Sequence, residues 1–259
     1  MGLFLNDKKK SHCEKLLYHS AKGRHAQHAE DAHDAPGQQH TAHAGQHALL
    51  KAHIQRNMVL TDTINKNMMT GEYGFYNEKR GYAFATDKAV AIDYSQGDSL
   101  FLHGDTLLME TFHLDTASMF REMRAFHKVR FYRTDVQGVA DSLVFSSKDS
   151  CLTMYRDPIL WNESQQLVGE KICIYMNDST IDWAHIINQA LTVEMKDSIH
   201  YNQVSGKEMK AYFENGDMRH IEVIGNVLTA FYPEEKDSTM TGFNCLEGSL
   251  LHLYMKDKK

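Results

Sequence analysis

The chain of 259 residues contains only 3 prolines and 4 cysteines, and it has no long apolar run. Scarce proline excludes collagen, and 42% hydrophobic residues exclude wholesale disorder. The cysteines are far apart and form no CxxC pair, which excludes a disulfide-dense scaffold and a cysteine-based zinc site. No apolar stretch approaches the roughly 18 residues that a membrane-spanning helix requires. We therefore expect a folded protein that does not cross a bilayer by helices.

The sequence also lacks the short motifs of common enzymes: no GxSxG, P-loop, dinucleotide-binding glycine motif or HExxH occurs. Two carboxylate pairs, Glu110 with Asp115 and Asp178 with Asp182, have the residue types of glycoside hydrolysis. Such pairs are expected by chance in an acid-rich chain. We predict a protein that is not an enzyme, with no catalytic residues, no bound metal and no cofactor.

Basic residues are scarce in the larger part of the chain. Residues 58–259 carry 20 Lys and Arg against 29 Asp and Glu, and they form no basic stripe. Nucleic-acid binding draws its affinity from Lys and Arg, so a nucleic-acid partner is not expected. A polybasic patch for membrane surfaces is missing for the same reason.

Nine of the 16 histidines fall within the first 53 residues. Residues 11–56 are rich in Ala, His, Gln and Gly and contain almost no Ile, Val or aromatic residues, so they bury too little apolar surface to offset the entropy of ordering. We predict a disordered, low-complexity insert over this range. Its imidazoles suit zinc, copper or nickel, but their irregular spacing favours incidental metal affinity over a built site.

From Asn57 onwards the texture changes to alternating apolar and polar residues separated by polar turns, which is the pattern of antiparallel strands. These segments form a degenerate repeat, and we expect residues 57–259 to be one all-β domain of short strands. The predicted repeat starts lie near Gly71, Gly97, Gly138, Gly169, Gly206 and Gly242.

Strands with one apolar face must bury those faces against each other. If the layers close tightly, the interior is only a core; if they splay, the same faces form a groove for a lipid chain. The aromatic residues Trp161, Trp183, Tyr155 and Tyr175 have two interpretations as well. They are a platform for a sugar or, more commonly for aromatics at strand spacing, cross-strand packing pairs.

Four segments carry a resemblance to a known family: GEYGFYNEKRGYAFATDKAVAIDYSQGDSLFLHGDTL, VRFYRTDVQGVADSLVFSSKDSCLTMYRDPILW, QLVGEKICIYMNDSTIDWAHI and HYNQVSGKEMKAYFENGDMRHIEVIGNV. Asp-Ser/Thr-Leu strand starts recur in them, as at Asp98, Asp105 and Asp141. The last segment ends in the triplet Gly225-Asn226-Val227. In these features residues 57–259 resemble the OstA-like proteins of the Bacteroidetes type. Those proteins are relatives of the LptA family and of the periplasmic part of the LptD family.

The resemblance implies a folded-over antiparallel jelly roll with an apolar interior that holds the acyl chains of lipopolysaccharide. Such domains stack end to end through their β-sheets with other lipopolysaccharide-transport proteins, or with copies of themselves, and bridge the periplasm for outer-membrane assembly. No catalytic residue is implied. The matching lipid-binding positions are Leu100, Leu102, Leu143, Phe145, Leu152, Met154, Ile172, Ile174, Met176, Met209, Phe213, Ile221, Val223, Leu251 and Leu253.

The same resemblance implies a periplasmic location, although the opening MGLFLNDKKK is not a secretory signal. We expect residues 1–10 to be the end of a preceding repeat, with the export signal further upstream. An alternative function is a closed β-sheet scaffold, or a partner-binding protein of the cell envelope, without lipid cargo. Sequence alone leaves open which face of each strand points inwards, because a shift of one residue exchanges the two faces.

Overall fold

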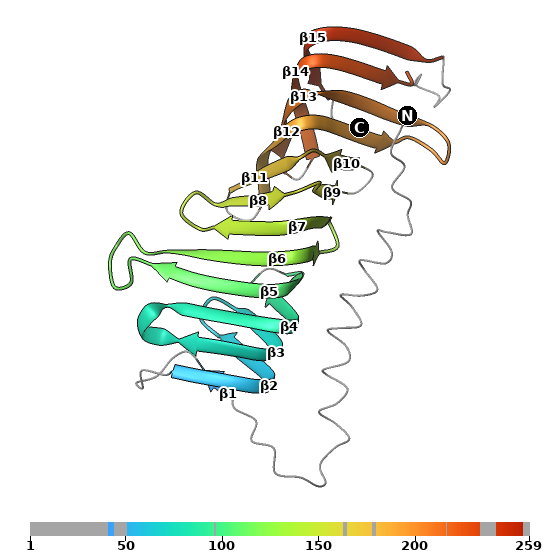
Figure 1. Ribbon diagram of the computed structural model, residues 1–259. Helices are drawn as coiled ribbons and strands as arrows, with labels where there is room; N and C mark the ends of the chain where they lie inside the picture. The colour runs from blue at the N-terminus through green and yellow to red at the C-terminus, as the bar shows by residue number, and fades with distance from the viewer. Residues whose placement is uncertain are drawn as a thin grey trace. The chain divides into compact units, whose positions relative to one another are not determined.

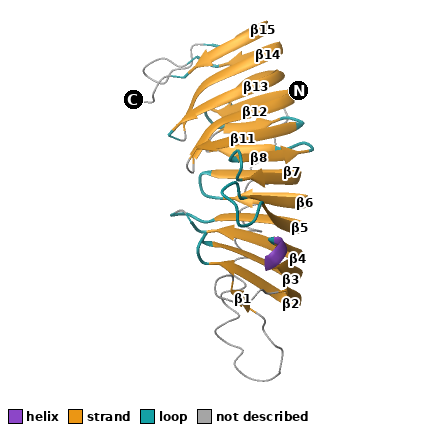
Figure 2. Ribbon diagram, turned by 90° about the vertical axis from the view of Figure 1, so that its left-hand side faces the viewer, coloured by secondary structure: helices purple, strands orange, loops and turns teal. Residues whose placement is uncertain are grey.

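The structure is a computed structural model that describes residues 41–43, 51–95, 97–162, 165–177, 180–215, 217–233 and 242–255, with side chains from residue 57 onwards. These residues form an all-β protein, as predicted. The only helical element among them is the 3-10 turn η1 (Glu78–Arg80), drawn in purple in Figure 2. In the described part of the chain, no helix has the length and apolarity needed to span a membrane.

The chain divides into two compact units, Met1–Val139 and Ala140–Lys259. In the first unit a short parallel pair is followed by antiparallel neighbours in sequence order. Its strands are β1 (Thr41–His43), β2 (Lys51–Asp62), β3 (Asn67–Asn77), β4 (Tyr82–Asp93), β5 (Leu100–Phe112) and β6 (Phe120–Tyr132).

In the second unit the described strand pairs are antiparallel, and β11 to β15 lie side by side in sequence order (Figure 1). Strand β7 (Val136–Ser146) begins in the first unit and ends in the second. The others are β8 (Cys151–Tyr155), β9 (Ile159–Asn162), β10 (Gln165–Val168), β11 (Lys171–Asn177), β12 (Thr180–Met195), β13 (Tyr201–Glu214), β14 (Asp217–Phe231) and β15 (Asn244–Tyr254).

Most strands are longer than the short strands that the glycine repeat predicted. Strands β12, β13 and β14 have 16, 14 and 15 residues. Gly71, Gly138 and Gly206 do not start strands but lie inside β3, β7 and β13, so that part of the repeat prediction is wrong. Glycine marks tight turns and mid-strand bulges alike, and the sequence pattern does not separate the two.

A bulge interrupts each of the long strands of the second unit at matching places. The pairing shifts between Ser205 and Glu208 in β13, beside Gly206, and between Ile187 and Ala190 in β12. In β12 the two intervening residues, Asn188 and Gln189, have φ of 58° and 49°. An extra residue in one strand of a pair bends that strand, so these bulges turn the long strands over.

The predicted insert over residues 11–56 overlaps two described elements. Strand β1 and the first six residues of β2, from Lys51, lie inside that range. The remainder of the insert, including most of its histidines, lies outside the described residues, as do residues 1–10.

Candidate functional site

Eleven of the fifteen predicted interior residues fall into two cross-strand rows of the second unit. Alternating side chains of neighbouring strands meet at the same height of a sheet, so the register fixes these rows. The first row runs through Leu143, Met154, Ile172, Ile186, Met209, Val223 and Leu251. The second runs through Phe145, Leu152, Ile174, Ala184, Ala211, Ile221 and Leu253.

The remaining four predicted residues lie elsewhere. Met176 and Phe213 sit towards one end of β11 and β13 and pair with Ile181 and Met218. Leu100 and Leu102 belong to the first unit, where Leu102 is buried and pairs with Ala91, while Leu100 pairs with Asp93 and is half-buried. The structure therefore does not gather all fifteen residues at one site.

A cavity of about 520 Å³ lies within the second unit, at the end formed by β14 and β15. Both halves of β14 line it, through Ile221 before the bulge and Thr229 after it. Both halves of β15 line it too, through Leu246 and Leu251. Because two halves of the same bent strand border one cavity, the strands fold over it. Its volume falls in the usual range of small-molecule sites.

Two groups of side chains line the cavity. From the first half of β14 and the second half of β15, the cavity is lined by the apolar side chains Met218, Ile221, Leu251 and Leu253, called here the apolar wall, with the charged Asp217 and Arg219 beside them. The mixed wall comes from β12, β13 and the other halves of β14 and β15. It combines apolar and polar side chains, namely Thr192, Glu194, Asn202, Val204, Thr229 and Leu246.

The polar groups of the mixed wall are held in place by hydrogen bonds. The Asn202 amide nitrogen donates to Glu194 Oε2 at 3.0 Å, and Asn202 Oδ1 accepts from the backbone nitrogen of Tyr232 at 2.9 Å. Buried polar groups with satisfied partners keep one orientation. The mixed wall therefore offers fixed polar side chains beside its apolar ones.

The cavity opens to solvent at the edge of the described sheet. Leu246 and Phe231 line it, yet they are 55% and 44% exposed. Strand β15 pairs only with β14 among the described residues, so its other edge presents backbone groups without a neighbouring strand. A ligand or a further strand can approach from this side.

Only three of the predicted interior residues, Ile221, Leu251 and Leu253, line the cavity. Val204 and Asn202 were missed because β13 was expected to start at Gly206, whereas it begins at Tyr201. The signal was present in the alternation. Apolar or buried positions are even-numbered before Gly206 and odd-numbered from Met209 onwards, as a bulge of one extra residue requires.

An aromatic ladder crosses the opposite face of the same sheet. Tyr175 stacks on Trp183 with ring centroids 4.1 Å apart, and Trp183 neighbours Tyr212 at 6.3 Å. Trp161 does not join them: it is buried, and its Nε1 donates to Gln166 Oε1 at 3.0 Å. Tyr175 and Trp183 are thus a cross-strand packing pair, whereas Trp161 and Tyr155 contact Gln166 and Lys171 instead.

The structure gives no support to the two carboxylate pairs considered for glycoside chemistry. Glu110 lies 3.6 Å from the guanidinium of Arg124, and Asp178 lies outside the described residues. Elsewhere on the sheet, burial and the neighbouring Glu222 carboxylate raise the pKa of Tyr212. Its hydroxyl thus remains a hydrogen-bond donor, and Glu222 Oε2 accepts from it at 3.3 Å.

The sequence was also compared with known protein families and with curated proteins. No family model matches the chain, and no curated protein matches it either.

Proposed function

We propose that this protein is a non-enzymatic, lipopolysaccharide-binding bridge of the periplasm that serves outer-membrane assembly. In this proposal the bent strands form the folded-over jelly roll of the OstA-like proteins, which the sequence resembles. The observation that carries it is the cavity between the two halves of β14 and β15, open at the end of the sheet.

The apolar wall suits acyl chains. Ile221, Leu251 and Leu253 present aliphatic surface to the cavity, and each methylene removed from water contributes about 0.8 kcal/mol. Ten methylenes of an acyl chain would contribute on the order of 8 kcal/mol before the costs of association. Binding of this kind needs no catalytic group, metal or cofactor.

The mixed wall suits an amphipathic lipid better than a plain hydrocarbon. Glu194 and Asn202 line the same cavity as the apolar wall and are hydrogen-bonded to each other, and Lys196 lines it too. Charged and hydrogen-bonding groups beside an apolar surface can orient a ligand that has both kinds of surface. Lipopolysaccharide has both.

The exposed edge of β15 suits end-to-end stacking. An extended strand of another lipopolysaccharide-transport protein, or of a second copy of this chain, can add to such an edge through backbone hydrogen bonds. Leu246 borders both the cavity and this edge, so stacking would extend the groove into the next protein.

Photo-crosslinking tests the proposal at two adjacent residues that face opposite sides of the sheet. Leu251 lines the cavity, whereas Leu250 lies on the outer face and is 57% exposed. A benzophenone amino acid at residue 251 is expected to label lipopolysaccharide, and the same group at residue 250 is not. Equal labelling from both positions, or labelling of protein alone from residue 251, would contradict lipid binding in the groove.

The alternative is a closed β-sheet scaffold or partner-binding protein without lipid cargo. It is favoured by the tight packing further from the opening, where Ile172, Ile186 and Val223 are fully buried. A scaffold would keep its edge strand for a partner and leave the cavity to solvent. Purified protein from envelope extracts that carries no lipid, while still crosslinking to a protein from residue 250, would support this alternative.

A further inference from the structure

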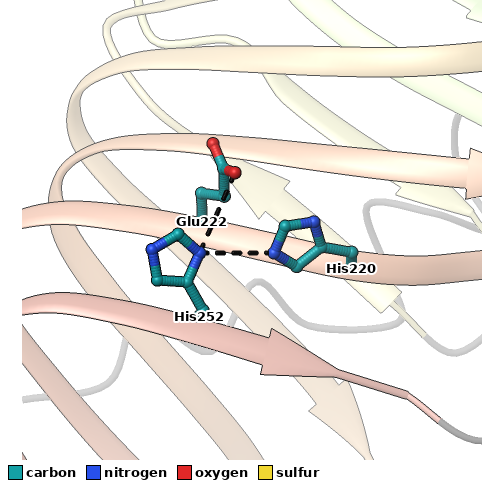
Figure 3. Close-up of side chains that lie close together, drawn as sticks. All are labelled: His220, Glu222 and His252. Atoms are coloured by element: carbon teal, nitrogen blue, oxygen red, sulfur yellow. Dashed lines mark hydrogen bonds and ion pairs between the residues drawn. The ribbon is translucent and has the colours of Figure 1, made fainter.

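Two histidines and a glutamate converge on the outer face of β14 and β15 (Figure 3). His252 Nδ1 lies 3.5 Å from His220 Nε2 and 3.8 Å from Glu222 Oε1. One ligand atom from each residue lies within 4.8 Å of the others. Within the part of the chain that the structure describes, this is the one group of three such side chains.

The strand register explains why these residues meet although Glu222 and His252 are 30 positions apart. Glu222 pairs directly with His252, and His220 lies two residues earlier on the same face of β14. Ile221 and Leu253 face the interior, so the alternation directs the trio outwards. None of the three side chains lines the cavity, and an inference from them does not rest on the proposed function.

Neighbouring tyrosines orient the side chains of His220 and Glu222. The imidazole of His220 stacks between the rings of Tyr254 and Tyr212, with centroids 4.4 and 5.3 Å away and interplanar angles of 2° and 14°. The Tyr212 hydroxyl donates to Glu222 Oε2. That bond leaves Glu222 Oε1 turned towards His252. Partners of this kind fix ligand geometry at metal centres.

We propose that His220, Glu222 and His252 form a binding site for a divalent transition metal, with zinc as the best-fitting ion. Two imidazole nitrogens and one carboxylate oxygen are a donor set that zinc accepts, with a fourth position left for water. Donor atoms around one tetrahedral zinc lie about 3.3 Å apart. The two separations from His252, 3.5 and 3.8 Å, need only small side-chain movements to reach that value, and the ligand atoms of His220 and Glu222, which lie within 4.8 Å of each other, have to move closer together.

A bound ion would tie the last described strand to its neighbour. His252 belongs to β15, whereas His220 and Glu222 belong to β14. The alternative is a simple N–H···N hydrogen bond between the two imidazoles, in which one ring donates and the other accepts. The two alternatives differ in the role of Glu222: its carboxylate binds the ion in the metal site, but it takes no part in a hydrogen bond between the two imidazoles.

Thermal unfolding of the full-length protein, with and without zinc chloride, tests the site. An ion that binds only the folded chain raises the midpoint, and zinc at a hundredfold excess over its dissociation constant is expected to give a rise of roughly 5–10 °C. Zinc that binds equally well to the folded and the unfolded chain, at any other histidine, does not change the midpoint.

Two ligand variants and one control variant test the site, each compared with its own metal-free midpoint. His252→Gln and Glu222→Gln are expected to abolish the zinc-dependent rise. His113→Gln removes an exposed histidine of the first unit and is expected to keep it. The proposal is overturned if zinc raises no midpoint in the unsubstituted protein, or if His252→Gln or Glu222→Gln retains the full rise.

Discussion

Gly206 and Val223 approach so closely at the bend of neighbouring strands that a β-carbon on residue 206 would lie 2.4 Å from Val223 Cγ1. The carbonyl oxygen of Gly225 would lie 3.2 Å from the same carbon. The Val223 side chain and the Gly225 carbonyl group thus fill the space that the side chain of a larger residue at position 206 would need. Glycine is favoured at residue 206 by this close approach and not by its backbone conformation, since φ of Gly206 is not in the left-handed region.

Gly206→Ala is therefore expected to lower the free energy of unfolding by about 1–3 kcal/mol, because Val223 or the strand backbone must shift. Urea unfolding followed by circular dichroism measures it. Gly248→Ala is the matched control in β15, where the nearest atom to an added β-carbon is 3.8 Å away. An equal loss in both variants would show that strand glycine, and not the contact with Val223, sets the cost.

The stacked rings of Tyr175 and Trp183 are expected to be energetically coupled. Their planes are 6° apart, and such pairs contribute about 0.5–1.5 kcal/mol beyond the area that they bury. A double-mutant cycle with Tyr175→Ala and Trp183→Ala measures the coupling by urea unfolding. Trp183 with Tyr82 of the first unit is the control cycle, for which additivity is expected. A coupling near zero for the stacked pair would contradict the prediction.

Stability is expected to depend on Asp197 at acidic pH. The hydrogen bond from His200 and the backbone amide of Ile199 lower the pKa of Asp197 from 3.8 to about 2. Between these values the folded chain keeps the carboxylate ionised while the unfolded chain protonates it. The stabilisation is thus complete above about pH 4 and is lost as pH falls towards about 2.

Asp197→Asn removes this ionisation and tests its contribution. The difference in unfolding free energy between the unsubstituted protein and the variant is expected to stay constant above about pH 5 and to shrink as pH falls from about 4 to about 2. His200→Gln removes the largest cause of the shift and is expected to narrow that pH window. Parallel stability curves for the protein and Asp197→Asn across the whole range would contradict the assignment.

The cysteines of the second unit are expected to differ in reactivity. Cys245 is exposed, whereas Cys151 and Cys173 are buried. Burial also raises the pKa of the Cys151 thiol, which lowers its fraction of reactive thiolate. Iodoacetamide labelling with peptide mass spectrometry is expected to modify Cys245 first, with all three reacting in denaturant. Equal rates at Cys245 and Cys151 in the folded protein would contradict the described burial.

The sequence predicted the all-β class and most of the buried alternation, because a period of two is a local signal. Leu143, Met154 and Ile172 meet in one row because each belongs to such an alternating segment. The bends could not be predicted in the same way. A glycine such as Gly206 has a place in a turn or in a bulge, and only the neighbouring strand shows which.

The cavity and the histidine cluster depend on pairing between distant segments, which a single sequence does not display. Val204 and Ile221 line the same cavity only because β13 and β14 bend together. His220 and His252 meet only because β14 and β15 pair antiparallel. Neither spacing resembles a metal motif, so sequence patterns alone predicted no site there.

The bends also govern how such a chain tolerates length changes. In β12 and β14 the bend contains two residues between paired positions, as at Asn188 and Gln189, and the interior face keeps its parity. In β13 only Lys207 lies between the paired positions Gly206 and Glu208, and the interior face changes from even to odd numbers. Loss of one residue at a bend would therefore turn half a strand inside out. Loss of a whole hairpin would remove one bend of each kind, and the remaining strands would keep the same side chains on the interior face. Repeats of this sheet can therefore be gained or lost in pairs of strands.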